Sequence, residues 1–286
     1  MSGINNPADD WSAVAPAWNR NIDYVESHTV TATKALVDAL AVRAGDRVLE
    51  LAAGPGSLGA TWSVLTGPPG RVVLSDIAPG MVDAARRRNA HLTNVEVALL
   101  DASSIARPDG SFDGVACRMG LMFTPDPAVA FGEIHRVLAP DGVFSALTWA
   151  ALEHNPWMTC VGMAAMINGL VSGRPPVGPG GIFSLGDPVE LEALAKSAGF
   201  VDVAVSEFPT TFQAESIDAH VERVSSLAGP LAAAFAAASA EQLAAVRRTA
   251  AHLAADYVTD KGLVLPGRAL LLTGGRAEPA ITVRRG

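Results

Sequence analysis

The middle of the chain alternates short runs of β-branched and leucine residues with segments of helical periodicity. The apolar runs have the length of buried strands and lie at residues 47–51, 72–74, 95–100, 112–117 and 143–148. Helical patterns separate most of these runs and lie at residues 57–66, 79–89 and 126–138. This alternation is typical of βαβ units, and right-handed crossovers between parallel strands predict a doubly wound sheet that is buried on both faces.

The segments on either side of this region are mainly helical. Before residue 45 the pattern predicts two short helices, the first with Trp11, Ala15 and Trp18 on one face. After residue 149 the expected elements are helices at residues 155–170, 187–198 and 215–258, with a break at Gly229-Pro230, and strands at residues 201–208 and 269–272. The Gly- and Pro-rich residues 174–181 predict a loop, which serves either as a plain connection or as a lid over a pocket.

Together these elements predict an α/β protein with a Rossmann-like, doubly wound and mostly parallel sheet of seven strands. Three parts of the chain are expected. Residues 1–44 form an N-terminal helical cap and residues 45–150 form the Rossmann-like core. Residues 151–286 supply cap helices over the substrate and the last strands of the sheet.

Composition narrows the class of protein. The 286 residues are 49% hydrophobic and 17% charged, as in globular proteins, and the net charge of −8 argues against a nucleic-acid partner. Cys117 and Cys160 form neither a disulfide framework nor a zinc pattern, which indicates buried thiols in a reducing compartment. The N-terminal residues lack the apolar stretch of a signal peptide, and no apolar run is long enough for a membrane span. We expect a cytoplasmic protein without integral membrane association and leave a homodimer open.

A glycine-containing loop follows the first predicted strand. Its sequence, ELAAGPGSLG over residues 50–59, lets a ligand approach the backbone just before a helix begins. Gly54, Gly56 and Gly59 also fit the dinucleotide pattern G-x-G-x-x-G, and Asp76 lies 20 residues after Gly56, where an acid that binds ribose is expected. The pattern is compatible with either NAD or S-adenosylmethionine as the bound nucleotide.

Carboxylates at three successive strand ends indicate which of these two cofactors is the better fit. In an open parallel sheet these ends line the ligand crevice. Glu50 ends the first strand, where a carboxylate suits a cationic ammonium better than a pyrophosphate. Asp76 would bind both ribose hydroxyls, with Ile77 and Met81 against the adenine face. Asp101-Ala102 ends the third strand, where the carboxylate can accept a hydrogen bond from the adenine amino group.

Four motifs then resemble, in order, those of the class I S-adenosylmethionine-dependent methyltransferases. They are VLELAAGPG (48–56), SDIAPGM (75–81), LLDASS (99–104) and FDGVACRMGLMFTPDPAVAFGEIHRVLAPDG (112–142). The last motif resembles the ubiquinone/menaquinone biosynthesis branch, and the resemblance covers residues 45–150. It implies that Glu50 and the backbone of Ala52, Ala53, Gly54 and Gly56 hold the methionine part of the cofactor, with the backbone of Arg118 and Met119 on its far side. Ala52 departs from the family, which usually has glycine at this position.

Two alternatives to a methyltransferase stay open. Tyr257 and Lys261 have the Y-x-x-x-K spacing of short-chain dehydrogenases, as an NAD-dependent oxidoreductase requires. However, Tyr257 lies about 200 residues past the glycine loop, later than in that family, and Ala244 stands where its catalytic serine is expected. A non-catalytic protein that binds S-adenosylmethionine is the other alternative. The six histidines show no ligand spacing, so no metal is predicted.

Methyl transfer depends mainly on holding the acceptor in line with an activated methyl group, so a fixed catalytic residue is not required. His154 and Tyr24 are the candidates for a base or an orienting group. Aromatic and methionine side chains that surround the predicted crevice favour a small apolar or aromatic acceptor, methylated on carbon, oxygen or nitrogen. They are Trp11, Trp18, Tyr24, Trp149, Trp157, Met158, Met163 and Met166.

Overall fold

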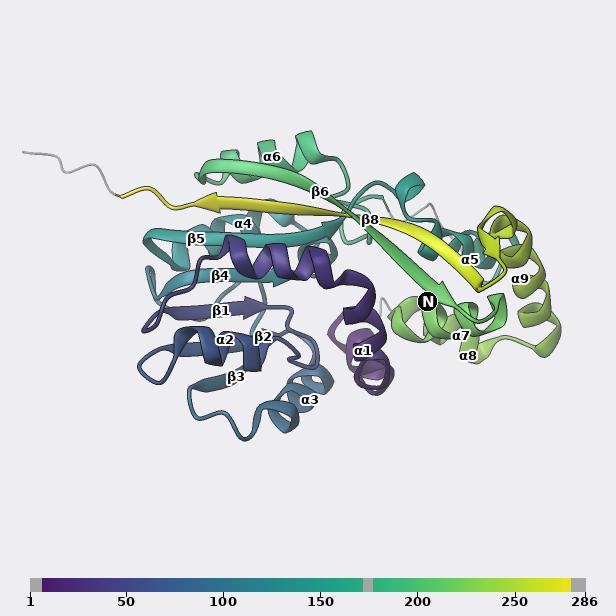
Figure 1. Ribbon diagram of the computed structural model, residues 1–286, viewed down its shortest axis with the longest axis horizontal. Helices are drawn as coiled ribbons and strands as arrows, with labels where there is room; N and C mark the ends of the chain where they lie inside the picture. The colour runs from purple at the N-terminus through teal and green to yellow at the C-terminus, as the bar shows by residue number, and fades with distance from the viewer. Residues whose placement is uncertain (1–6, 172–176, 279–286) are drawn as a thin grey trace, which may run out of the picture.

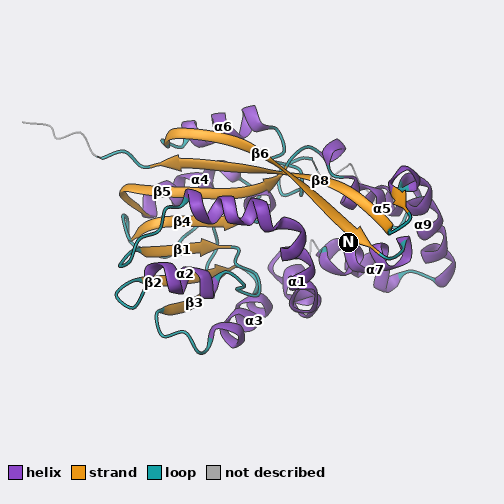
Figure 2. Ribbon diagram, viewed as in Figure 1, coloured by secondary structure: helices purple, strands orange, loops and turns teal. Residues whose placement is uncertain are grey.

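The computed structural model describes residues 7–171 and 177–278, so part of the expected lid at residues 174–181 lies outside the described residues. Its main feature is one twisted sheet with the strand order β3-β2-β1-β4-β5-β8-β6 (Figures 1 and 2). Five parallel strands form its first part: β1 (Arg47–Leu51), β2 (Arg71–Asp76), β3 (Val95–Leu99), β4 (Phe112–Arg118) and β5 (Leu138–Trp149).

The other strands are antiparallel to β5 or to each other. They are β6 (Val201–Ala214), β8 (Gly262–Gly275) and the short β7 (Val258–Thr259), which pairs only with β8. The predicted fold class, a mostly parallel α/β sheet, is confirmed, with seven strands on the main path and β7 as the eighth. The strand order reverses between β1 and β4, and a ligand crevice is expected at that point, outside the carboxyl ends of the strands.

The N-terminal segment differs from its prediction. Instead of two short helices, the chain forms one helix, α1 (Pro7–Ala39), which continues through Pro16. Polar residues that interrupt the apolar pattern still fit a helix, because Asn21 and Thr29 bond to the carbonyls of the preceding turn. The helix changes direction along its length (Figure 1), so that Val14 and Ala15 pack against Met81 while Leu36 packs in the core of the sheet.

Within the described residues, eight further α-helices follow α1. They are α2 (Gly59–Thr66), α3 (Pro79–Asn89), α4 (Pro127–Val137), α5 (Pro156–Ile167), α6 (Pro188–Ser197), α7 (Ile217–Leu227), α8 (Gly229–Ala237) and α9 (Ala240–Leu253). The predicted break at Gly229 is present. A second break precedes α9, where Ser239 and Gln242 form a reciprocal capping box that the alanine-rich pattern did not reveal.

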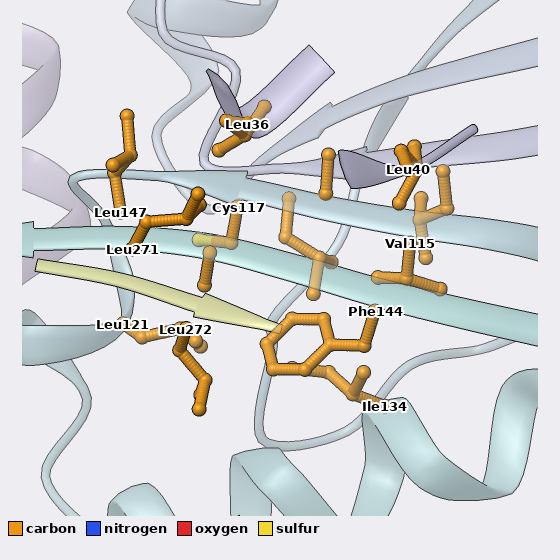
Figure 3. Close-up of a cluster of buried hydrophobic side chains, with 14 of the residues drawn as sticks. Leu36, Leu40, Val115, Cys117, Leu121, Ile134, Phe144, Leu147, Leu271 and Leu272 are labelled. Carbon is orange, nitrogen blue, oxygen red and sulfur yellow. The ribbon is translucent and has the colours of Figure 1, made fainter. Parts of the chain in front are cut away.

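The main core lies between the sheet and the helices that cover it. Figure 3 shows how side chains from the end of α1 and the residue after it, from β4 and the 3-10 helix that follows it, and from α4, β5 and β8 meet in one cluster: Leu36, Leu40, Val115, Cys117, Leu121, Ile134, Phe144, Leu147, Leu271 and Leu272. All of these are at most 6% exposed. Because the strands are fixed by this packing, the loops at their carboxyl ends start from rigid anchors.

A second apolar cluster joins α5, α7 and α9 to the outer end of β8 and forms a helical cap, visible on the right of Figure 1. It contains Cys160, while Cys117 lies in the main core, and both thiols are free and buried. Burial raises the pKa of each thiol to about 12, so both stay protonated and unreactive near neutral pH. The expectation of two buried thiols is confirmed.

The cap also buries a histidine whose titration will affect stability. His220 of α7 is fully buried, and its Nε2 bonds the carbonyl of Trp157. Burial lowers the pKa of His220 to about 4, below its ordinary value of 6.5. The stabilising contribution of neutral His220 is therefore complete above pH 6.5 and is lost as the pH falls through 4.

We expect His220→Gln, which keeps an N–H donor, to remove this acid sensitivity. To test this expectation, denaturant unfolding at several pH values measures the difference in unfolding free energy between the wild type and the variant. Between pH 7 and pH 4 that difference should shift by a few kcal/mol in favour of the variant. A difference that does not change with pH would show that His220 is not kept neutral by the fold.

Candidate cofactor site

The glycine loop leaves β1 through a chain of backbone hydrogen bonds. Ala52 adopts a left-handed conformation with φ 50°, and the next N–H, of Ala53, donates to the Ser75 carbonyl at the end of β2 (2.8 Å). The Gly56 N–H then donates to the Ala53 carbonyl (2.9 Å), which closes a tight turn. The loop is thus attached to both β1 and β2 before α2 begins at Gly59.

The glycines of the loop differ in what a side chain at each position would meet. A Cβ on Gly56 would lie 2.6 Å from the Asn89 side chain, and one on Gly59 would lie 2.2 Å from the same side chain. Asn89, at the end of α3, donates to the Gly56 carbonyl (2.9 Å) and so holds the turn from behind. By contrast, a Cβ on Gly54 would meet nothing within 4 Å, so open space lies beside this residue. Asn89 could not be predicted from the sequence, because an asparagine at a helix end carries no distinctive pattern.

The open space beside Gly54 can be filled as a test of ligand approach. Valine is unsuitable there, because Gly54 has φ +54° and β-branched residues are strained in that region. Asparagine tolerates left-handed backbone and adds a side chain. We expect Gly54→Asn to remain folded and to lose at least about tenfold in affinity for S-adenosylhomocysteine, measured by calorimetry. Unchanged affinity would show that no ligand approaches the backbone at this position.

Asp76, at the end of β2, holds the glycine loop through its carboxylate. One oxygen accepts from the Gly54 N–H (2.9 Å) and the other from the Ala78 N–H at the start of α3 (2.9 Å). Burial raises the pKa of Asp76, while these backbone hydrogen bonds lower it. Each carboxylate oxygen retains acceptor capacity after one bond, so both can also accept from a diol.

Glu50, in contrast, lies beneath the site. Its side chain is 1% exposed and accepts from the Trp62 indole N–H of α2 (2.8 Å). Burial raises the pKa of Glu50 to about 7, and the nearby Arg118 guanidinium opposes this rise while Glu26 and Asp76 add to it. A neutral carboxyl that becomes an anion beside a cationic ligand is thus available at the switch point of the sheet.

Arg118 and Met119 end β4 directly opposite the glycine loop. The Arg118 guanidinium donates to the Ser57 hydroxyl (2.7 Å) and pairs with Glu26 of α1 (3.3 Å). Met119 has φ 58°, a left-handed conformation like that of Ala52. A Cβ on Gly120 would lie 2.2 Å from the Ala52 Cβ, so this glycine makes room for the alanine that departs from the family.

The residues predicted for the adenine end lie farther along the same edge. Asp101 follows β3, is exposed, and bonds the N–H of Ser103 within its own turn (2.8 Å), next to the half-buried Ala102. Ile77 is 40% exposed, whereas Met81 is buried against Val14 and Ala15 of α1. The structure therefore leaves Ile77 accessible and uses Met81 to attach α1 to α3.

The two catalytic candidates have different surroundings. Tyr24 of α1 donates its hydroxyl to the Gln213 carbonyl on β6 (2.9 Å), and the Arg223 guanidinium lies 3.9 Å from its ring centre. Burial raises the pKa of Tyr24, which makes it a poor base. His154 ends a short 3-10 helix after β5 and is exposed. Neither is brought among the carboxylates, and their assignment stays a prediction.

The dehydrogenase-like pair lies in the cap. Tyr257 packs against the second cluster, and Lys261 is exposed in the turn between β7 and β8. Over residues 7–171 and 177–278, no group of three or more His, Cys, Asp and Glu could hold a metal ion. In the same ranges no helix is long and apolar enough to cross a bilayer.

Comparisons with known proteins now define the class. Residues 49–146, which contain the site loops after β1, β2, β3 and β4, match the family described as "Methyltransferase domain". Residues 49–146 therefore form a methyltransferase domain, and the predicted resemblance of this region to the S-adenosylmethionine-dependent methyltransferases is confirmed.

Among curated relatives, the ubiquinone/menaquinone biosynthesis C-methyltransferase UbiE of Teredinibacter turnerae is 38% identical over 125 residues, which are 43% of this chain and 50% of the relative. The chain thus spans about half the length of this relative. Of the solved structures, the YcgJ protein of Bacillus subtilis has a TM-score of 0.60 at 19% identity, over 86% of this chain and 98% of that one. Phosphoethanolamine N-methyltransferase 2 of Haemonchus contortus, in complex with S-adenosyl-L-methionine, has a TM-score of 0.51 at 17% identity, over 91% and 53%.

Proposed function

We propose that the protein transfers the methyl group of S-adenosylmethionine to a small, largely apolar or aromatic metabolite. The observation that carries this proposal is the position of Asp76 and Arg118 around the buried Glu50 at the switch point, where Asp76 also accepts from the Gly54 N–H of the glycine loop (2.9 Å). Two carboxyl groups, of Glu50 and Asp76, favour a ligand with positive charge. S-adenosylmethionine has a sulfonium and an ammonium group, whereas the pyrophosphate of NAD is negative.

The residues present fit this cofactor, as the open space beside Gly54 and the free acceptor capacity of Asp76 indicate. In the proposal, Asp76 binds the ribose hydroxyls and Glu50 faces the ammonium. The adenine lies near Ile77, Asp101 and Ala102, with the buried Met81 behind Ile77 rather than in contact with the ring. The backbone of Ala52–Gly56 and of Arg118 and Met119 encloses the methionine part. When bound, S-adenosylmethionine supplies a methyl group that its sulfonium has already activated.

Aromatic side chains support an apolar or aromatic acceptor. Trp149 ends β5, and Trp157 stacks on Phe212 of β6 with ring centres 3.8 Å apart. Tyr24 lies against the same group, 6.3 Å from Phe212. In the proposal these rings form a wall beside the carboxyl end of β5, next to β4 in the sheet. Tyr24 and Trp157 are partly exposed there, whereas Trp149 and Phe212 are buried in the main core behind them. The wall and the α1 helix would orient the acceptor and exclude water.

The relative UbiE is named a C-methyltransferase of quinone biosynthesis, which favours carbon as the acceptor atom. Oxygen and nitrogen are alternatives within the same proposal, in quinone or in secondary metabolism. A general base is required only if the acceptor has to lose a proton, and His154 is then the better candidate, because it is exposed whereas Tyr24 is bound to a carbonyl. The two buried free thiols support a cytoplasmic location, and the acidic net charge supports a small-molecule partner.

Parallel calorimetric titrations with S-adenosylmethionine, S-adenosylhomocysteine and NAD test the cofactor. We expect saturable binding of the two sulfur nucleotides and none of NAD. Transfer of a labelled methyl group to a panel of phenols, quinols and apolar amines then tests the activity. Binding of NAD alone would overturn the proposal in favour of an oxidoreductase. Cofactor binding without transfer to any acceptor class would favour a non-catalytic binding protein.

A further inference from the structure

Arg118 is nearly buried but incompletely paired. Its side chain is 13% exposed, yet its contacts with the Glu26 carboxylate are long, at 3.3 and 3.4 Å. Its other contacts are with hydroxyls, to Ser57 at 2.7 Å and to Thr33 at 3.5 Å. Guanidinium–carboxylate hydrogen bonds are normally about 2.7–2.9 Å, so Glu26 is not an optimal partner for this cation.

Another arginine of the sheet shows what a well-paired guanidinium looks like here. Arg47, at the opposite end of β1, makes a two-pronged pair with Asp113, at 2.7 and 3.0 Å. That arginine is 44% exposed and can be solvated by water, whereas Arg118 is the least exposed arginine among the ion pairs of the described ranges. A buried cation needs close anionic partners more than an exposed one does, because little water stabilises it.

The position of Arg118 identifies the kind of anion that is missing. Its guanidinium is attached to the glycine loop through Ser57 and is close enough to Glu50 to stabilise that carboxylate. The Glu50 carboxyl and the Arg118 guanidinium thus lie near each other where the methionine end of the cofactor is expected. A zwitterionic amino acid group carries a carboxylate and an ammonium on one carbon, and its two charges match this pair.

We propose that the Arg118 side chain binds the α-carboxylate of the cofactor's methionine end, and that Glu26 occupies this place when the cofactor is absent. This inference rests on the proposed function, since it assumes S-adenosylmethionine as the cofactor. A planar guanidinium and a carboxylate match in a two-pronged geometry. Glu26 is 35% exposed, so its carboxylate can turn to solvent at low cost once it is displaced.

The exchange predicts opposite effects for the two partners. Arg118→Gln removes the carboxylate's partner and should weaken binding of S-adenosylhomocysteine by about 10- to 100-fold. Glu26→Gln removes a competitor for the same guanidinium and should tighten that binding about two- to fivefold. A merely structural bridge between α1 and β4 would instead weaken binding in both variants.

Calorimetric titration with S-adenosylhomocysteine and with 5′-methylthioadenosine, which lacks the amino acid group, tests the proposal. We expect both substitutions to change the affinity for S-adenosylhomocysteine and to leave that for methylthioadenosine within about twofold of wild type. Arg47→Gln is the matched control, since it breaks a stronger arginine pair away from the site. Thermal melting of each variant shows whether it is folded.

Equal losses for both ligands in Arg118→Gln, or weaker binding of S-adenosylhomocysteine in Glu26→Gln, would overturn the assignment. If Arg118→Gln does not fold, Glu26→Gln still decides, because only displacement of Glu26 predicts tighter binding. Failure of the wild type to bind either ligand would refute the proposed cofactor itself. If instead the wild type binds and neither substitution alters its affinity, only the role of Arg118 is refuted.

Discussion

Replacing Glu50 by glutamine will stabilise the empty protein at pH 8 and weaken its binding of S-adenosylhomocysteine. The fully buried carboxyl has a pKa of about 7 in the fold, against 4.5 for an ordinary glutamate. At pH 8 the native protein therefore holds a buried anion, while the unfolded chain holds a solvated one. Glutamine has nearly the same shape, carries no charge, and keeps an oxygen that accepts from Trp62.

The sign of the pH dependence follows from the direction of the shift. A folded pKa above the unfolded value means that the stability contributed by protonated Glu50 is complete below pH 4.5 and is lost as the pH rises through 7. The gain in unfolding free energy for Glu50→Gln should thus be small at pH 4.5 and reach about 3 kcal/mol above pH 7. Denaturant unfolding at both pH values measures this difference.

Binding should change in the opposite direction. The cofactor's ammonium stabilises the anion of Glu50, so at pH 6.5 the wild type should release a proton when it binds S-adenosylhomocysteine. Calorimetry in buffers of different ionisation enthalpy detects that proton, and Glu50→Gln should abolish it while lowering affinity about tenfold or more. Glu207→Gln, on the exposed side of β6, is the control. Proton release that persists in Glu50→Gln would contradict the assignment.

Asp76→Ala will have the second large effect, on both binding and stability. Its carboxylate accepts the N–H groups of Gly54 and Ala78, and alanine leaves both donors without this partner. We expect a loss of about 1–3 kcal/mol in unfolding free energy for these donors. The ribose loses a charged acceptor in addition, so affinity for S-adenosylhomocysteine should fall by a further 1–3 kcal/mol, or about 5- to 150-fold.

Asp76→Asn separates these two contributions. Its single carbonyl oxygen can replace one of the two backbone contacts, so we expect stability between that of the wild type and that of Asp76→Ala. Asp101→Ala is a second comparison, because this exposed carboxylate belongs to its own turn and should affect binding more than folding. Unchanged affinity in a folded Asp76→Ala variant would remove Asp76 from the ribose site.

The parallel half of the fold is predictable because local sequence determines it. Runs such as residues 72–74 are too short and too apolar for helices, and Gly-Pro signals punctuate them. The antiparallel half is less predictable. β6 and β8 extend to Ala214 and Gly275 because they pair with each other over most of their length, a contact between segments far apart in sequence. Likewise, Pro140-Asp141-Gly142 predicts a turn, but β5 includes it as an irregularity between the Phe112 and Gly114 pairings with β4.

The site shows the same division. Asp76 and Gly54 follow strands in recognisable motifs, and the structure joins them by a hydrogen bond. Glu26 could not be predicted, because it reaches the site only through the path of the single helix α1, where two helices were expected. Gly120 was also missed, since its role depends on the Ala52 side chain, which lies against it from the loop after β1.

The place of β8 in the sheet also constrains how the chain folds during synthesis. This strand lies between β5 and β6, although more than 100 residues separate it from β5 in sequence. Until residues 262–275 leave the ribosome, β5 has an open edge and β6 has no neighbour in the sheet. Such late, long-range pairing gives a high contact order and exposes apolar edges to aggregation. The nascent chain is therefore expected to need chaperone protection until β8 is inserted.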